Sequence, residues 1–215
     1  MKLLWAAAGL GLLLQAAPPA EKGPFRPRDL VEVTALDGGI KTDVRYATEH
    51  NFMKRVLYPQ ARVFLQREAA LGVVRAHRAL RAQGYGLLLF DGYRPWRITR
   101  MMWDLTPPAQ RDFVADPAKG SKHNRGCAID LSMYALADGR EVEMPSAYDE
   151  FSERAHPAYQ GGSAGQRARR DLLRRTMERE GFYVEPTEWW HFNCRDWRSY
   201  RIEDVPFEEL GSPTR

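Results

Sequence analysis

The residues best suited to chemistry lie in the segment 121–130, which reads SKHNRGCAID. It places His123 on a glycine-containing loop and then carries Asp130 along a short apolar strand. A carboxylate flanked by aliphatic residues is costly to bury unless a positive group compensates for its charge. Strand alternation puts Asp130 on the same face as Ala128 and Ser132, where a metal ion or an arginine could meet it. The alternative is an aspartate that caps a loop beside a hydrogen-bonded histidine.

A second candidate group stands late in the chain, in the run EWWH that ends at His191. Two tryptophans beside a histidine make a dry, apolar wall, which strengthens the electrostatics of a metal site. Glu188 and His191 are three residues apart and would point to opposite faces of a flat strand. Both reach one site only if Glu188 lies on the turn before the strand, and Pro186 favours such a turn. The alternative is a tryptophan-rich core strand with a partly exposed acid.

Together, these residues predict a catalytic rather than a structural metal site. Two histidines and one carboxylate leave a tetrahedral zinc ion with an open position. A glutamate that does not bind the metal can act as general base. The helical HExxH arrangement is absent from the sequence, so the ligands must come from separate segments. Three other histidines are expected to be ordinary surface or loop residues, namely His50, His77 and His156.

Arg94 is the remaining candidate, because it follows a buried apolar run in the segment DGYRP. An arginine at a sheet edge could hold the oxyanion that forms when a peptide carbonyl is attacked. The alternative is an arginine that pairs with Asp91 across the turn.

Hydrophobic periodicity predicts the elements that must position these side chains. Helices are expected at 65–83, 95–104 and 166–180, with Gly84 and Gly181 ending the first and the last. Strands are expected at 85–90, 127–134, 182–184 and 189–194, with a hairpin turn at Asp138-Gly139. Helices mixed with hairpin-linked strands indicate an α+β domain whose sheet is mainly antiparallel.

Composition fits one globular domain. The chain has 215 residues, of which 44% are hydrophobic and 28% charged, and its net charge is +4. Basic and acidic residues are interleaved, and the arginines of 166–180 fit a solvated helix face, so no nucleic-acid partner is expected. Residues 1–20 have the layout of a secretory signal peptide, with Lys2 before a short apolar run and small residues after it. An uncleaved anchor is the alternative. We therefore expect an exported, periplasmic domain over 21–215, without stable membrane association after signal removal.

Four segments, taken in order, resemble the D-alanyl-D-alanine dipeptidases of the VanX type, within the zinc D-Ala-D-Ala peptidases. They are DVRYAT (43–48), QGYGLLLFDGYRP (83–95), SKHNRGCAIDL (121–131) and TEWWHF (187–192). The resemblance runs from Asp43 to Phe207. It implies an α+β fold of the type shared with the hedgehog domain, with a mainly antiparallel sheet flanked by helices.

The same resemblance implies roles for individual residues. Zinc would be bound by His123, Asp130 and His191. Glu188 matches the general base, and Arg94 matches the arginine that stabilises the tetrahedral intermediate.

Substrate contacts follow from the resemblance as well. Asp149, helped by Tyr46, would hold the free amino terminus of a small D-amino-acid dipeptide, and Ser121 would line the pocket. The implied reaction is hydrolysis of D-Ala-D-Ala in cell-wall peptide turnover. The alternatives are an exported carboxypeptidase or broader dipeptidase of the same fold, and a catalytically silent zinc-binding module. The sequence leaves the oligomeric state open.

Two cysteines are present, Cys127 and Cys194. An exported protein permits one disulfide, and two buried free thiols are the alternative. Cys127 lies three residues before Asp130, and Cys194 lies three after His191. If the two strands are neighbours, the sulfurs would meet on the face away from the metal.

Overall fold

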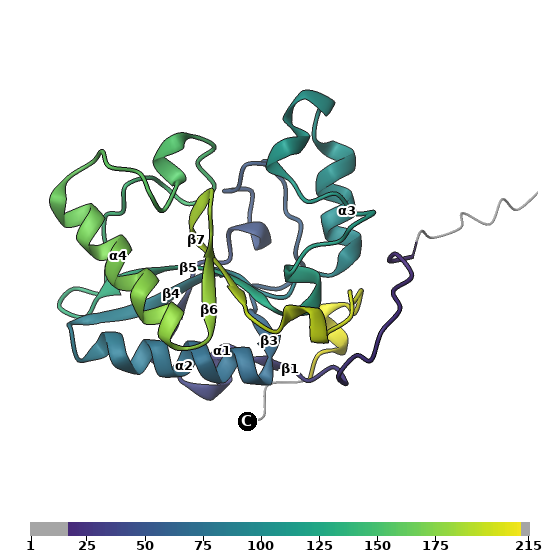
Figure 1. The fold of residues 1–215 in the computed structure, drawn as a ribbon, viewed down its shortest axis with the longest axis horizontal. Helices are drawn as coiled ribbons and strands as arrows, with labels where there is room; N and C mark the ends of the chain where they lie inside the picture. Colours follow the sequence, from purple (N-terminus) through teal and green to yellow (C-terminus); the bar gives the residue numbers. More distant parts are fainter. Residues whose placement is uncertain (1–16, 212–215) are drawn as a thin grey trace, which may run out of the picture.

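A five-stranded sheet forms the centre of the computed structural model, which describes residues 17–211. Its strand order is β2-β4-β5-β7-β6, and all of these strands except β2 are labelled in Figure 1. The strands are β2 (Lys41–Thr42), β4 (Tyr85–Asp91), β5 (Ala128–Ala135), β6 (Phe182–Glu185) and β7 (Glu188–Cys194). Only the β2–β4 pair of this sheet is parallel. The mainly antiparallel sheet of an α+β fold is therefore confirmed. Residues 1–16 of the predicted signal segment lie outside the described residues, so this segment stays a prediction.

Two long helices cover one face of this sheet. They are α2 (Arg67–Arg81) and α4 (Ala164–Arg179), which pack against each other; in Figure 1, α2 lies below β4 and α4 lies beside β6. In α2 the residues Ala69, Val73 and Leu80 are buried, as their spacing predicts. The helix α4 begins with a capping box between Ser163 and Gln166.

The remaining elements are short and surround the sheet. The strands β1 (Leu30–Glu32) and β3 (Phe64–Gln66) form a separate two-stranded sheet, and the short helix α1 (Val33–Leu36) follows β1 directly. The helix α3 (Trp96–Leu105) lies across the five-stranded sheet from α2 in Figure 1. Short 3-10 turns occur at Arg45–Ala47, Pro108–Phe113, His123–Arg125, Glu153–Ala155, Trp197–Ser199 and Phe207–Glu209. Among residues 17–211, no helix is long and apolar enough to cross a membrane.

One expectation about the first helix is wrong, because His77 is not on the surface. Its side chain is fully buried, and Nδ1 accepts a hydrogen bond from the backbone N–H of Leu87 at 3.1 Å. His77 lies three or four residues from Val73, Val74 and Leu80, so it shares their buried face of α2. The arginines beside it in sequence lie on other faces. His50 and His156 are exposed, as expected.

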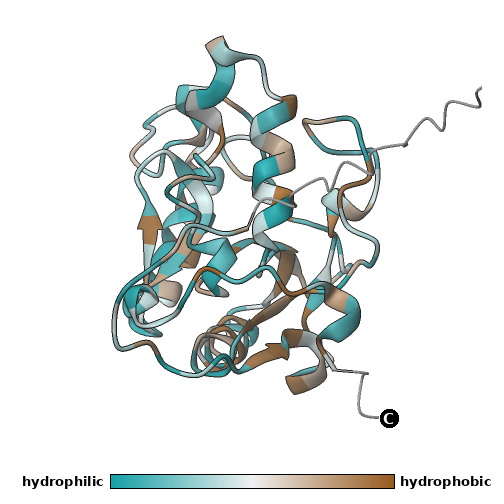
Figure 2. Ribbon diagram, turned by 90° about the vertical axis from the view of Figure 1, so that its right-hand side faces the viewer, coloured by the Kyte–Doolittle hydropathy of each residue, from teal (hydrophilic) through white to brown (hydrophobic). Residues whose placement is uncertain are grey.

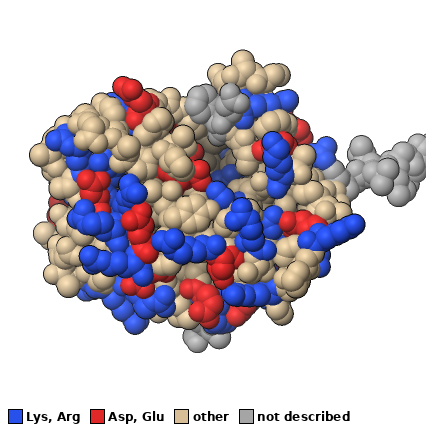
Figure 3. All heavy atoms as spheres, in the orientation of Figure 1, with Lys and Arg blue, Asp and Glu red and all other residues tan. Residues whose placement is uncertain are grey.

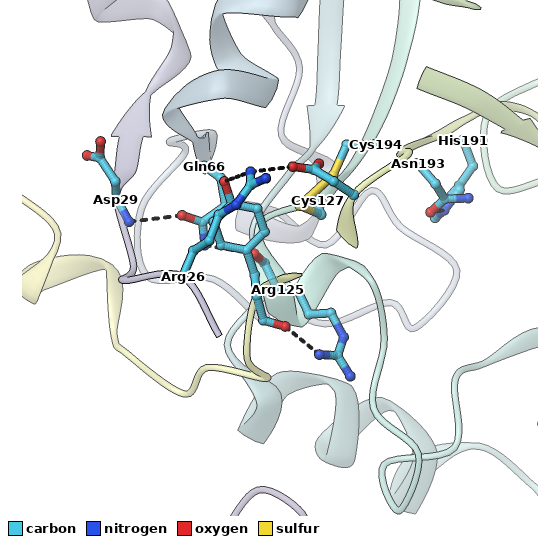
Figure 4. The surroundings of a disulfide bond; sticks show 10 residues. Arg26, Asp29, Gln66, Arg125, Cys127, His191, Asn193 and Cys194 are labelled. Atoms are coloured by element: carbon cyan, nitrogen blue, oxygen red, sulfur yellow. Dashed lines mark hydrogen bonds and ion pairs between the residues drawn. A yellow bond between two sulfur atoms is a disulfide. The ribbon is translucent and has the colours of Figure 1, made fainter. Parts of the chain in front are cut away.

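The register between β5 and β7 brings the two cysteines together. Asp130 pairs with His191 and Ala128 pairs with Asn193, so Cys127 comes to lie opposite Cys194. A disulfide joins them, with the Cα atoms 5.2 Å apart (Figure 4). The proposed bridge is thus confirmed, and it ties the strands that carry Asp130 and His191.

Hydrophobic residues are concentrated on the central strands, which are largely brown in Figure 2. Trp189, Trp190 and Phe192 are buried along β7 and fill much of this core. On the face drawn in Figure 3, positive and negative side chains are interspersed rather than gathered by sign. This distribution agrees with a solvated surface, although Arg170 of α4 is buried and donates to the carbonyl of Tyr159.

Candidate active site

Three side chains with metal-ligand chemistry meet where β5 and β7 pair. His123, Asp130 and His191 each offer one ligand atom, and these atoms all lie within 4.8 Å of one another. Nε2 of His123 is 3.2 Å from Nδ1 of His191. Asp130 Oδ1 is 3.0 Å from the same Nδ1. Ligands of a tetrahedral zinc ion at about 2.1 Å stand roughly 3.4 Å apart, so the cluster fits such an ion.

The orientation of His123 is fixed from two sides. Nδ1 lies 2.7 Å from the carbonyl oxygen of Gly92, which can only accept, so Nδ1 carries the proton and donates it. Nε2 is therefore the nitrogen with a free lone pair, and it faces the cluster. The backbone N–H of His123 donates to Ser121 Oγ at 3.2 Å, which holds the short turn His123–Arg125 in place.

The hydrogen bonding of the Asp130 carboxylate favours a bound cation. Its Oδ1 is buried and has no hydrogen-bond partner among the described residues. The other oxygen, Oδ2, accepts from the hydroxyl of Tyr148 at 3.2 Å. A buried carboxylate oxygen without a donor is costly unless a positive charge meets it. Together with two correctly turned histidines, it makes this cluster fit a zinc ion.

The electrostatics of the cluster point the same way. Burial opposes charge on His191, but the carboxylate of Asp130 outweighs it and raises the pKa of His191 to about 9. Burial would raise the pKa of Asp130, yet His123 and His191 hold it well below its usual value. The site therefore favours a cation beside Asp130, whether a proton on His191 or a metal ion.

Glu188 lies beside the cluster without being one of its three members. It is the first residue of β7, next to a register shift in the pairing with β6, so it leaves the regular alternation. Its Oε2 is 3.5 Å from His191 Nδ1. Burial raises the pKa of Glu188 above its usual value. The expectation that Glu188 and His191 face one site is met by this irregular strand start.

The position of Arg94 is compatible with both of its expected roles, the ion pair with Asp91 and contact with a bound ligand. Its Nε and Nη2 both donate to Oδ2 of Asp91, at 3.1 and 2.6 Å, so the pair across the turn exists. Asp91 is held in turn by the hydroxyl of Tyr58 at 2.7 Å. Within residues 17–211, Nη1 of Arg94 has no hydrogen-bond partner, and Arg94 lines the same cavity as His123. The ion pair thus leaves one nitrogen available to a ligand.

Asp149 stands in the same cavity, with its carboxylate held by Tyr46. The Tyr46 hydroxyl donates to Oδ2 of Asp149 at 3.1 Å. Burial, reinforced by the negative charge of Asp130, raises the pKa of Asp149 well above its usual value. Its backbone is left-handed, with φ of 60°, a conformation that few residues other than glycine, asparagine and aspartate adopt.

One cavity of about 520 Å³ connects these groups. All eight predicted site residues line it, namely Tyr46, Arg94, Ser121, His123, Asp130, Asp149, Glu188 and His191. The structure therefore brings together every residue that the sequence singled out. Their roles stay predictions, because geometry alone does not assign them.

Two supporting residues were missed in the sequence. Tyr148, which donates to Asp130, precedes Asp149 directly and could have been noticed beside it. Oδ1 of Asn193 accepts a hydrogen bond from Nε2 of His191 at 2.8 Å, and Asn193 lies two residues after His191, on the same strand face. The carbonyl of Gly92 is a backbone group, and its role leaves no signal in side-chain type.

Comparison with known proteins decides the family. The model of the Peptidase_M15 family, described as D-ala-D-ala dipeptidase, matches residues 26–207. The chain belongs to this family. This M15 peptidase is 36% identical to a D-alanyl-D-alanine dipeptidase of Enterococcus faecium over 179 residues, which covers 74% of this chain and 87% of that protein.

Two further similarities extend the comparison. A D-alanyl-D-alanine dipeptidase of Escherichia coli (strain K12) is 30% identical to the M15 peptidase over 185 residues, covering 86% of this chain and 94% of that protein. The solved structure of the LdcB LD-carboxypeptidase is 19% identical, with a TM-score of 0.46, and the match covers 87% of this chain and 80% of that chain.

Proposed function

We propose that this M15 peptidase hydrolyses D-alanyl-D-alanine to two D-alanines, with a zinc ion held by His123, Asp130 and His191. The observation that carries the proposal is the presence of Asp149 in the same cavity as the three-residue cluster. The cluster supplies the hydrolytic centre, and the carboxylate supplies a partner for a free amino end. The sequence relationship to D-alanyl-D-alanine dipeptidases supports the same substrate.

A zinc ion in this cluster would supply Lewis-acid chemistry for peptide hydrolysis. The protein side chains have separate tasks. Glu188, beside His191, takes a proton from the attacking water and delivers it to the leaving amine. Burial raises the pKa of Glu188 above its usual value, which makes its carboxylate a stronger base. Arg94, held by Asp91, directs its free Nη1 at the oxyanion of the tetrahedral intermediate.

Asp149 limits the length of the substrate. An ammonium group paired with the Asp149 carboxylate gains a charge-assisted hydrogen bond, while Tyr46 fixes the carboxylate from its other side. A longer peptide has a neutral amide at this position and leaves the buried carboxylate without a cationic partner. This arrangement favours a dipeptidase over a carboxypeptidase. Glu188 and Arg94 argue against a silent zinc-binding module, because such a module needs neither.

We further propose that the enzyme works outside the cytoplasm, in the periplasm, on dipeptides from wall peptide turnover. The signal-like composition of residues 1–20 supports export. The disulfide between Cys127 and Cys194 supports it independently, because such bonds persist in oxidising compartments.

The substrate is tested with purified protein and three peptides: D-Ala-D-Ala, L-Ala-L-Ala and N-acetyl-D-Ala-D-Ala. We expect turnover of the free D,D-dipeptide and a value of kcat/KM at least about tenfold lower for the acetylated peptide, since its amino end cannot pair with Asp149. Equal hydrolysis of the acetylated and free D,D-dipeptides would refute the dipeptidase proposal in favour of the carboxypeptidase. If neither of these two peptides is hydrolysed, both the dipeptidase and the carboxypeptidase proposals are refuted.

A further inference from the structure

The side chain of Asn193 connects the metal-binding cluster to a pair of charged residues, Glu185 and Lys122, that line the same cavity. Asn193 is fully buried on β7, beside His191, as Figure 4 shows. Its Oδ1 lies 2.8 Å from Nε2 of His191, and its Nδ2 lies 3.0 Å from Oε2 of Glu185. The same Glu185 oxygen accepts from Lys122 Nζ at 3.0 Å.

The polarity of this chain follows from the chemistry of its groups. An ionised carboxylate only accepts hydrogen bonds, so the amide group facing Glu185 must be the Nδ2 donor. Oδ1 of Asn193 is then the atom that faces His191. Because Oδ1 is an acceptor, Nε2 of His191 must carry a proton and donate it.

Lys122 supports the first link of this hydrogen-bond series, the contact between Glu185 and Asn193. Burial would raise the pKa of Glu185, but the hydrogen bond and positive charge of Lys122 outweigh it and keep the carboxylate ionised. Lys122 itself is the residue directly before His123. The two charged residues therefore define the orientation of a neutral amide at a buried position, where a hydrogen bond is strong and a mismatch is costly.

We propose that Asn193 is a positioning residue that fixes the protonation pattern of His191, and that Glu185 and Lys122 set the orientation of its amide. With the Nε2 proton held by Asn193, the coordinating lone pair of His191 is on Nδ1. Nδ1 is the nitrogen that lies 3.2 Å from His123 Nε2 and 3.0 Å from Asp130 Oδ1. If the amide were reversed, its donor would face Nε2, and the proton would move to Nδ1, among the metal ligands.

The hydrogen bonds through Lys122, Glu185 and Asn193 thus orient His191 as the backbone carbonyl of Gly92 orients His123. In both cases a fixed acceptor holds the proton on the outer nitrogen and directs the inner nitrogen at the cluster. Partners of this kind raise metal affinity, and their loss costs about 10- to 100-fold. The inference rests on the proposed zinc site, but it concerns metal binding and needs no substrate.

Zinc affinity, measured by competition with a chelator, tests the proposal through Glu185→Gln and Asn193→Ala. A glutamine at 185 has nearly the shape of glutamate but can donate as well as accept, so it no longer dictates the amide orientation. We expect about tenfold weaker zinc binding for Glu185→Gln and between 10- and 100-fold weaker binding for Asn193→Ala. Glu32→Gln is the matched control, because Glu32 pairs with Arg62 away from the cluster.

A spectroscopic measurement separates positioning from a general loss of stability. In ¹⁵N-labelled, zinc-loaded protein, His191 should show a slowly exchanging Nε2–H, and Glu185→Gln should speed its exchange. Control-like zinc affinity with an unchanged Nε2–H in Glu185→Gln would overturn the proposal, and this variant decides the matter if Asn193→Ala does not fold. A wild-type protein that binds no zinc would instead refute the proposed metal site.

Discussion

Replacing Glu188 with glutamine will leave zinc binding intact and lower kcat for D-Ala-D-Ala by about 10²- to 10⁴-fold. Glutamine keeps the size of the side chain but cannot take a proton from water or deliver it to the leaving amine. Glu188 is not one of the three clustered ligands, and it lies 3.5 Å from His191 Nδ1. The loss should therefore fall on turnover, with the zinc content unchanged.

Zinc content by elemental analysis and steady-state kinetics measure these two effects separately. Glu32→Gln makes the same chemical change away from the site and should keep wild-type turnover. Near-native kcat in Glu188→Gln would show that another group is the base. Loss of zinc together with activity would show that Glu188 belongs to the metal site.

Replacing Asp149 with asparagine should lower kcat/KM for D-Ala-D-Ala by about 10- to 100-fold. A hydrogen bond to a charged group contributes roughly 1.5–3 kcal/mol, and each 1.4 kcal/mol is a factor of ten. Asparagine tolerates the left-handed backbone at this position, so the fold should persist. The acetylated dipeptide, which has no ammonium group, should be affected much less. Equal losses for both peptides would contradict the assigned role.

The same substitution should make the metal-free protein more stable, increasingly so as the pH rises. Burial raises the pKa of Asp149 in the folded state above its unfolded value. Below the unfolded pKa both states hold the proton, and Asp149 costs nothing. Between the unfolded and the folded pKa, the unfolded state releases the proton while the folded state keeps it, so the stability of the wild type falls until the pH passes the folded pKa.

Thermal unfolding of metal-free protein at several pH values measures this difference. The Tm advantage of Asp149→Asn over wild type should be small near pH 4, grow above it and then level off. Asp104→Asn, an exposed substitution on α3, should show no such trend. A Tm difference that is independent of pH would contradict the raised pKa.

Much of the fold could be predicted because its main elements have strong periodic patterns. The expected helix at 65–83 and strand at 85–90 correspond to α2 (Arg67–Arg81) and β4 (Tyr85–Asp91). The short strands β1, β2 and β3 were not expected, and β2 has only two residues, too few for any alternation. Such strands form because neighbouring backbone needs partners, which the side-chain pattern does not record.

In the site, too, residue types reveal some features, whereas others depend on tertiary geometry. His123, Asp130 and His191 could be found because their residue types suit a metal, and the register of β5 with β7 then unites them. His77 was assigned to the surface because its sequence neighbours are arginines, whereas its neighbours in space are set by helical spacing. Asn193 and Gly92 act through hydrogen bonds to the histidines, and those partners depend on tertiary geometry.

Titration of the metal-free enzyme with zinc, followed by hydrolysis of D-Ala-D-Ala, tests the central claim most directly. With His123, Asp130 and His191 as the only ligands of one catalytic ion, activity should start near zero. It should rise in proportion to added zinc and level off at one equivalent per chain, and His191→Ala should show no such rise. Full turnover in protein shown by elemental analysis to hold no metal would contradict the claim.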